Sequence, residues 1–289
     1  MRPDGLEKGL APAKVNLALH VTGRRAGGYH LLDSLVVFAG VGDQLTALPA
    51  NDLALEVEGP FSAGVPLDER NSVLRAAYAL RQARDVTQGA RLKLTKTLPH
   101  AAGIGSGSSD AAATIRLLSE FWGVEPLAPD APEVLELGAD VPVCLSAPTP
   151  MRMTGIGEVL DPAPALPACG LVLVNPGVEV PTAEVFGKLE RSENGPMDDL
   201  PAGLDYAGFL GWLKAQRNDL QDPAEAITPE IGRALARLRR MPGVDLALMS
   251  GSGATCVGLT RDMGRARQVA RAIQLSEMGW WVAPAPLLS

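Results

Sequence analysis

The chain has 289 residues, with 26 basic and 33 acidic side chains and a formal net charge of −7. Because 46% of its residues are hydrophobic and 20% are charged, the composition is that of a globular protein, and the length favours about two domains. The net negative charge argues against sequence-independent binding of nucleic acid, and no run approaches the ~18 apolar residues of a membrane span, so we expect neither partner.

The first predicted element is a strand over residues 13–22, where apolar and polar side chains alternate. One face carries apolar side chains, namely Val15, Leu17, Leu19 and Val21. The other face carries Lys14, Asn16 and His20, so Lys14 and Asn16 point the same way. This pattern predicts a half-buried strand and leaves open whether its polar face meets solvent or a ligand.

A loop with two arginines follows over residues 23–30 and ends in Tyr29 and His30. Aromatic residues make up only 4% of the chain, so an aromatic side chain in this loop either packs on the core or binds a ligand. Three further strands are predicted over residues 34–39, 44–48 and 53–58. A helix over residues 71–83 and a strand over residues 91–97 come next.

The segment over residues 99–109 is rich in glycine and serine and reads Pro-His-Ala-Ala-Gly-Ile-Gly-Ser-Gly-Ser-Ser. It follows a predicted strand and precedes an alanine-rich helix that begins after Asp110. Glycines let a ligand approach the main chain, and a helix N-terminus offers unpaired N–H groups, so this turn predicts an anion site, most often for phosphate. Its spacing matches neither a P-loop nor a dinucleotide fold, and a plain turn is the alternative.

A weak helical pattern around residues 133–137 is followed by Gly-Ala-Asp-Val-Pro at residues 138–142. Proline favours an extended conformation in the residue before it, so Asp140 is predicted to lie between a helix and a short strand over residues 143–145. An aspartate in such a turn is usually a capping or turn residue, and a functional carboxylate is the alternative. Three prolines within residues 161–167 predict a domain boundary after residue 160.

The second half is predicted to contain a buried strand over residues 171–174 and a helix that starts near Thr182, with Phe186 near its first turn. Further helices are predicted over residues 205–214, 229–239 and 265–273, and a last strand over residues 280–283. Residues 247–257 read as strand, glycine turn and strand. This is a plain hairpin, unless Gly251 and Gly253 admit a ligand.

The three cysteines, Cys144, Cys169 and Cys256, are widely spaced and lie in apolar company. They form no metal-ligand pattern, so we expect buried thiols in a reducing compartment. Because the first residues also lack the apolar core of a signal peptide, a cytoplasmic protein is expected.

Four segments occur in a fixed order, over residues 11–17, 27–30, 99–112 and 250–253. Together they resemble the GHMP kinase superfamily, named for its galacto-, homoserine, mevalonate and phosphomevalonate kinases. Within it, residues 138–142, 175–182 and 217–220 are similar to the kinases that phosphorylate the 2-hydroxyl of 4-diphosphocytidyl-2-C-methyl-D-erythritol in non-mevalonate isoprenoid biosynthesis.

The resemblance implies an α+β fold of two domains. Residues 1–160 would form an ATP-binding domain like the second domain of ribosomal protein S5, and residues 161–289 a ferredoxin-like substrate domain. It also implies ATP and Mg²⁺ as cofactors, the cytidyl-diphosphate methylerythritol as substrate, and a monomer or weak homodimer. The alternatives are a homoserine- or mevalonate-type kinase and a non-catalytic nucleotide-binding regulator of the same fold.

Carried over residue by residue, the resemblance implies Asp140 as the catalytic base and Lys14 as its partner. ATP would be bound by Pro99, Ala101, Ala102, Gly103, Ile104, Gly105, Ser106, Gly107, Ser108 and Ser109, with a loop hydroxyl such as that of Ser109 near Mg²⁺. The substrate would be bound by Asn16, Tyr29, His30, Thr182, Phe186, Gly251 and Gly253. Tyr29 and Phe186 would sandwich the cytosine ring, with His30 at its edge. The superfamily often has glycine where Ser106 stands, and His100 is unusual.

Overall fold

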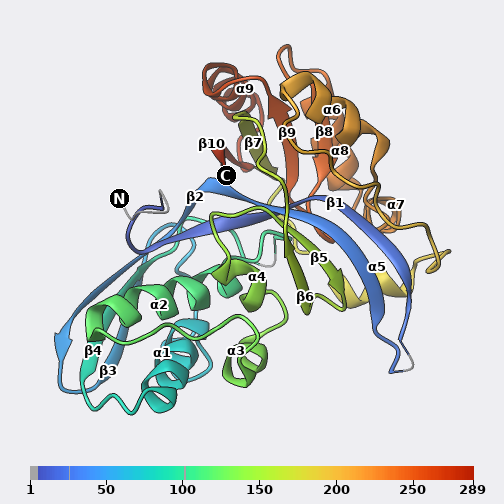
Figure 1. The fold of residues 1–289 in the computed structure, drawn as a ribbon. Coiled ribbons are helices and arrows are strands. Elements are labelled where there is room, and N and C mark those ends of the chain that lie inside the picture. The colour runs from blue at the N-terminus through green and yellow to red at the C-terminus, as the bar shows by residue number, and fades with distance from the viewer. Residues whose placement is uncertain (1–5, 26, 101) are drawn as a thin grey trace. The chain divides into compact units, whose positions relative to one another are not determined.

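The computed structural model describes residues 6–25, 27–100 and 102–289, and these form two compact units (Figure 1). Unit 1 comprises the described residues within Met1–Ala13, Gly42–His100 and Gly105–Pro148. Unit 2 comprises those within Lys14–Val41, Ala101–Ile104 and Thr149–Ser289. Each unit contains both strands and helices, which confirms the predicted α+β class. Ala101, a predicted ATP contact, lies outside the described residues.

The sheet of unit 1 is formed by β3 (Leu53–Glu58), β4 (Gly89–Thr95) and the second half of β2 (His30–Ala50). β2 pairs with β4 in antiparallel fashion, and β3 pairs with β4 in parallel. The leucines of β4 are buried while Arg91 and Lys93 are exposed, so the alternating pattern of the sequence turns one face of the sheet to the core.

Four helices complete unit 1, namely α1 (Ser72–Ala83), α2 (Ser106–Trp122), α3 (Pro132–Leu137) and α4 (Val141–Leu145). α1 packs against α2 and α3, and α2 packs against α4 (Figure 1). Asn71 begins α1 by accepting a hydrogen bond from Val73 N at 2.8 Å, and Gly123 ends α2 with a left-handed φ of +66°.

The strand predicted over residues 143–145 is wrong, because α4 occupies these residues. Pro142 lies in the first turn of α4, where a proline is tolerated because the N–H groups of that turn have no partner within the helix. Asp140 directly precedes α4, and its side chain makes no capping hydrogen bond to it. The capping interpretation of Asp140 is therefore not supported.

The main sheet of unit 2 is antiparallel and runs in the order β10 (Trp281–Leu288), β7 (Gly170–Asn175), β9 (Cys256–Thr260) and β8 (Leu246–Met249). The first half of β2 pairs with β10 and with β5 (Met151–Gly155), which forms a hairpin with β6 (Val159–Pro162). No strand was predicted over the residues of this hairpin, because β5 and β6 are too short to show a clear period.

The helices of unit 2 are α5 (Thr182–Gly187), α6 (Tyr206–Ala215), α7 (Gln221–Ile227), α8 (Pro229–Arg239) and α9 (Met263–Ser276). α8 and α9 pack on the main sheet and enclose a core that includes Val172, Leu235 and Ile273 (Figure 1). The predicted burial of the cysteines is confirmed: Cys144, Cys169 and Cys256 are buried and form no disulfide in the described part of the chain. Within the described part of the chain, no helix is long and apolar enough to cross a membrane.

β1 (Leu10–Arg24) is buried on both faces, so the predicted half-buried strand is wrong. Lys14 and Asn16, on the polar face, are only 5% and 1% exposed. Segments far along the chain cover β1: Leu19 N donates to Arg217 O at 2.9 Å, for example. The alternation of apolar and polar side chains along β1 shows which face is polar. It cannot show that other segments of the chain cover that polar face.

β2 is one strand over His30–Ala50, where two separate strands were predicted. Unit 2 takes residues from both sides of position 160, since it includes Lys14–Val41. The division of the chain at residue 160 stays a prediction.

Candidate active site

The glycine loop leads directly into α2. Gly103 and Gly105 have left-handed φ angles of +70° and +59°, which glycine adopts without strain. Gly105 is the N-cap residue of α2, and no side chain caps this end of the helix. The first N–H groups of α2 therefore lack helical partners, and together with the helix dipole they favour an anion.

The turn over residues 250–255 contacts the glycine loop through the main chain. A Cβ atom on Gly103 would lie 2.5 Å from Gly253 O and 2.6 Å from Ser250 O. Ser250 Oγ donates to Gly103 O at 3.0 Å, and Thr255 N donates to Ala102 O at 3.1 Å. Two glycine-containing segments that are far apart in the sequence thus meet closely, and only glycine fits at position 103.

The polar residues of β1 join the same cluster. Lys14 N donates to Ile104 O at 3.0 Å, and Asn16 N donates to Ser250 Oγ at 3.1 Å. The Asn16 side chain donates to Ser34 Oγ at 2.7 Å, but its buried Oδ1 has no hydrogen-bond partner among the described residues. Buried acceptors are normally paired, so this oxygen is suited to a donor group of a ligand.

Several predicted substrate residues lie in contact. The rings of His30, on β2, and Phe186, on α5, stack with centroids 4.8 Å apart and planes 26° apart. Tyr29 is 66% exposed, so the structure places His30 and not Tyr29 on the Phe186 ring. Thr182 Oγ1 and Ser252 Oγ share a hydrogen bond of 2.8 Å, which ties α5 to the turn over residues 250–255.

Unit 1 contains a buried charged cluster at the first turn of α2, made of Lys96, Asp43, Asp110 and Ser106. Lys96 Nζ donates to Asp43, to Ser106 Oγ at 2.6 Å and to Asp110 Oδ2 at 2.8 Å. Burial raises the pKa of Asp110 to about 7, although the Lys96 ammonium opposes the shift. The cluster ties α2 to β2, so Ser106, where the superfamily often has glycine, takes part in holding the helix start.

The serine hydroxyls of the loop have different partners. Ser109 Oγ donates to Pro12 O at 2.8 Å, and Ser106 Oγ accepts from Lys96. Ser108 is partly exposed and its hydroxyl has no protein partner among the described residues. Pro99 and Ile104, both within the loop, are buried. Ser108 is therefore the loop serine best placed to contact a ligand.

Lys14 and Asp140 lie in different units. Lys14 is buried within β1 in unit 2, and Asp140 is partly exposed before α4 in unit 1. Their action as a pair stays a prediction.

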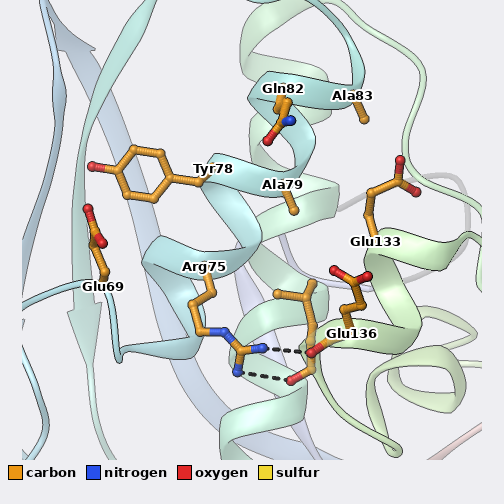
Figure 2. Close-up of a pocket in the computed structure, with 9 residues that line it drawn as sticks. Glu69, Arg75, Tyr78, Ala79, Gln82, Ala83, Glu133 and Glu136 are labelled. Carbon is orange, nitrogen blue, oxygen red and sulfur yellow. Dashed lines mark hydrogen bonds between the residues drawn. The ribbon is translucent and has the colours of Figure 1, made fainter.

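A separate pocket of about 650 Å³ lies between α1 and α3 in unit 1 (Figure 2). Glu69, Glu133 and Tyr78 are among its lining residues, and Arg75 donates to the main-chain oxygens of Glu136 and Leu137 at 2.6 and 3.3 Å. None of the predicted site residues lines it, so we do not assign it to the candidate active site.

Two family models match the chain: the GHMP kinases N terminal domain over residues 71–148 and the GHMP kinases C terminal domain over residues 206–277. A 4-diphosphocytidyl-2-C-methyl-D-erythritol kinase of Cereibacter sphaeroides (strain ATCC 17029 / ATH 2.4.9) is 53% identical over 98% of this chain and 100% of its own length. The kinase of that name from Jannaschia sp. (strain CCS1) is 53% identical over 97% of each chain. The chain belongs to the GHMP kinases, in the 4-diphosphocytidyl-2-C-methyl-D-erythritol kinase family.

Solved structures agree with this family. A crystal structure of 4-(cytidine 5'-diphospho)-2C-methyl-D-erythritol kinase is 34% identical, with a TM-score of 0.79 over 97% of this chain and 98% of that one. A homoserine kinase from Cytophaga hutchinsonii has a TM-score of 0.66 over 99% of this chain and 96% of that one. At 14% identity, that second likeness shows the shared GHMP kinase fold alone.

Sequence reasoning gave no role to residues 217–220, which contact segments of the candidate site. Asn218 Nδ2 donates to Met249 O at 2.9 Å and to Gly251 O at 2.8 Å, while Asp219 Oδ2 accepts from Val21 N at 2.7 Å. The segment thus holds both β1 and the turn over residues 250–255. The similarity of residues 217–220 to the family could have indicated that this segment has a role.

Two other groups in this GHMP kinase were missed. Lys96 and Asp43 were assigned no role, because nothing local in the sequence predicts that a lysine and an aspartate will be buried together. Arg24 Nε donates to His30 Nε2 at 3.0 Å. The sequence does not distinguish Arg24 from its neighbour Arg25, so this contact was not predicted.

Proposed function

We propose that this kinase transfers the γ-phosphoryl group of ATP to the 2-hydroxyl of 4-diphosphocytidyl-2-C-methyl-D-erythritol. The observation that carries the proposal is the cluster in which β1, the glycine loop and the turn over residues 250–255 are joined by hydrogen bonds through Lys14, Gly103 and Ser250. The family's full-length similarity supports the choice of substrate, since the relatives bear the name of that kinase.

ATP phosphates would bind at the glycine loop and the first turn of α2. The left-handed glycines let the phosphates approach the main chain, and the N–H groups of the first turn supply donors. The residues present fit a metal held mainly by the nucleotide: the Ser108 hydroxyl has no protein partner among the described residues, and Mg²⁺ commonly keeps waters and substrate phosphates as ligands. Mg²⁺ would neutralise charge on the phosphates.

Asp140 would accept the proton of the substrate hydroxyl. The hydroxyl oxygen attacks the γ-phosphorus of ATP, the bond between the γ-phosphorus and the bridging β-phosphate oxygen breaks, and ADP is released. Lys14 would orient Asp140 and offset developing negative charge. Phosphoryl transfer depends mainly on alignment and charge neutralisation, which are the roles proposed for Lys14 and Asp140 beside the phosphate site.

The cytosine ring would lie near His30, Phe186 and Tyr29, with Thr182, Asn16, Gly251 and Gly253 around the rest of the substrate. Aromatic stacking on a base is worth roughly 1–3 kcal/mol, and Phe186 already holds one ring parallel to its own. The exposed Tyr29 is free of that stack and would close over the base. We further propose a cytoplasmic monomer or weak homodimer. Three buried cysteines without a disulfide in the described residues fit a reducing compartment.

The test is ATP-dependent phosphorylation of 4-diphosphocytidyl-2-C-methyl-D-erythritol, with homoserine and mevalonate assayed in parallel. Transfer to the cytidyl compound alone is expected. Transfer to another alcohol would support kinase activity and contradict the proposed substrate. ATP binding without transfer would favour a regulator.

The Asp140→Asn variant is expected to lower kcat by about 10²–10⁴, the usual contribution of a general base. The KM for ATP should change little, because the glycine loop is untouched. Single-turnover kinetics measure the chemical step directly. A variant with normal kcat would remove Asp140 from the role of base.

A further inference from the structure

Arg24 determines which ring nitrogen of His30 carries hydrogen. Arg24 is the last residue of β1, and its Nε donates to His30 Nε2 at 3.0 Å. Arginine has donors and no acceptor, so the Nε2 atom must be the unprotonated acceptor of this bond. A neutral histidine carries one ring hydrogen, which is then placed on Nδ1.

The surroundings keep this imidazole neutral and fix its plane. Burial and, to a lesser degree, the Arg24 charge lower the pKa of His30 below its ordinary value of 6.5. The stack on Phe186, with planes 26° apart, restricts rotation of the ring. Nδ1 has no protein partner among the described residues. His30 therefore presents one N–H donor to whatever binds beside Phe186.

We propose that Arg24 is the positioning residue that makes this site select cytosine over uracil, by holding His30 in the form with hydrogen on Nδ1. The proposal rests on the proposed function, in which the cytidyl group binds beside His30. Cytosine and uracil differ at ring atom N3, which is a bare acceptor in cytosine and an N–H donor in uracil. An Nδ1–H donor forms a hydrogen bond with N3 of cytosine, but it faces another donor at N3–H of uracil.

Arg24 affects base selectivity through the tautomer of His30. Without Arg24, His30 could carry its hydrogen on Nε2 and offer Nδ1 as an acceptor. That form would accept the N3 hydrogen of uracil and oppose cytosine. Arg24 removes this alternative without contacting the base, so its loss should alter selectivity more than overall activity.

The first measurement is a long-range ¹H–¹⁵N spectrum of the full-length protein, which distinguishes protonated from unprotonated ring nitrogens. The chain has only three histidines, so a His30→Gln variant assigns the signals. We expect the His30 proton on Nδ1 in the wild type and on Nε2 in Arg24→Met. Arg24→Lys keeps a donor-only side chain and should restore the wild-type spectrum in whole or part.

The second measurement compares the cytidyl substrate with its uridyl counterpart, by calorimetric Kd and by kcat/KM. Arg24→Met should reduce the cytidyl preference by roughly 10- to 100-fold, the effect of one opposed hydrogen bond, while the KM for ATP stays unchanged. Arg25→Met is the matched control, because Arg25 pairs instead with Glu158 at 3.0 Å; it should keep the wild-type preference.

The two measurements distinguish a failure of the role of Arg24 from a failure of the proposed function. A wild-type proton on Nε2, or an Arg24→Met variant that keeps the wild-type Kd ratio, overturns the role of Arg24. Failure to phosphorylate either compound overturns the proposed function, while the Kd ratio and the spectrum still decide the role of Arg24.

Discussion

Lys96 carries a charged group where almost no solvent reaches it, at 2% exposure. Removing an ammonium from water is costly, and here the cost is offset by Asp43, Asp110 and Ser106 within hydrogen-bond reach. Asp43 in turn accepts the main-chain N–H groups of Thr97 and Leu98. Each partner depends on the others, so the loss of one leaves a buried charge unpaired.

The Lys96→Met variant is expected to lower the free energy of unfolding by about 3–5 kcal/mol, because it leaves two buried carboxylates without their counter-ion. Lys93→Met is the control, since Lys93 forms an exposed pair with Glu58 and should change stability by no more than about 1 kcal/mol. Urea denaturation measures both. Equal, small effects would mean that the buried cluster contributes little.

At the scale of elements, the glycine loop and the start of α2 use glycine for two different reasons. Gly103 is confined by the main chain of the turn over residues 250–255, with two carbonyl oxygens within 2.6 Å of its missing Cβ. Among the described residues, a Cβ atom on Gly107, in the first turn of α2, would have only Ser72 Oγ within 4 Å, at 3.7 Å. The first glycine is required for folding, and the second leaves space beside the helix N-terminus.

Paired substitutions separate these roles. Gly103→Ala should destabilise the protein by roughly 1–3 kcal/mol through overlap and a strained φ. Gly107→Ala should stabilise it by roughly 0.5–1 kcal/mol and raise the KM for ATP, because the added methyl group crowds the phosphates. Thermal denaturation and ATP titration on the same preparations test this. An unchanged KM in Gly107→Ala would place the phosphates away from the first turn of α2.

At the scale of the whole molecule, each unit is assembled from three separate segments of the chain. In unit 2 the core contains Leu19 and Val21 of β1 together with Val172 and Val174 of β7. The first half of β2 also pairs with β10 and β5 of the same unit. Unit 2 therefore needs residues from the beginning of the chain to cover its own sheet.

A fragment of residues 161–289 is expected not to fold cooperatively, because it lacks β1, β2 and β5 of its unit. Co-expression with a fragment of residues 1–160 should restore a folded kinase. Circular dichroism and thermal melting measure the result. If the isolated fragment melted cooperatively, the predicted domain boundary after residue 160 would gain direct support.

Much of this fold follows from local patterns. The helix over Pro229–Arg239 and the strand over Leu53–Glu58 have the predicted bounds, because apolar spacing and nearby breakers define them. The glycine loop is a strand-to-helix turn, as expected, because left-handed glycines and an uncapped helix start are properties of a few adjacent residues. These features depend on neighbours in sequence.

Other features exist only after distant segments meet. The burial of Lys14 and Asn16 and the pairing of Lys96 with Asp43 and Asp110 depend on segments whose proximity no local pattern reports. The α4 helix after Asp140 likewise forms against α2, although a short apolar strand was predicted there. The sequence by itself therefore determined most of the elements, the family and the glycine-rich turn before α2. Tertiary structure alone decided which polar side chains are buried and paired, because burial and pairing depend on groups brought together by the fold.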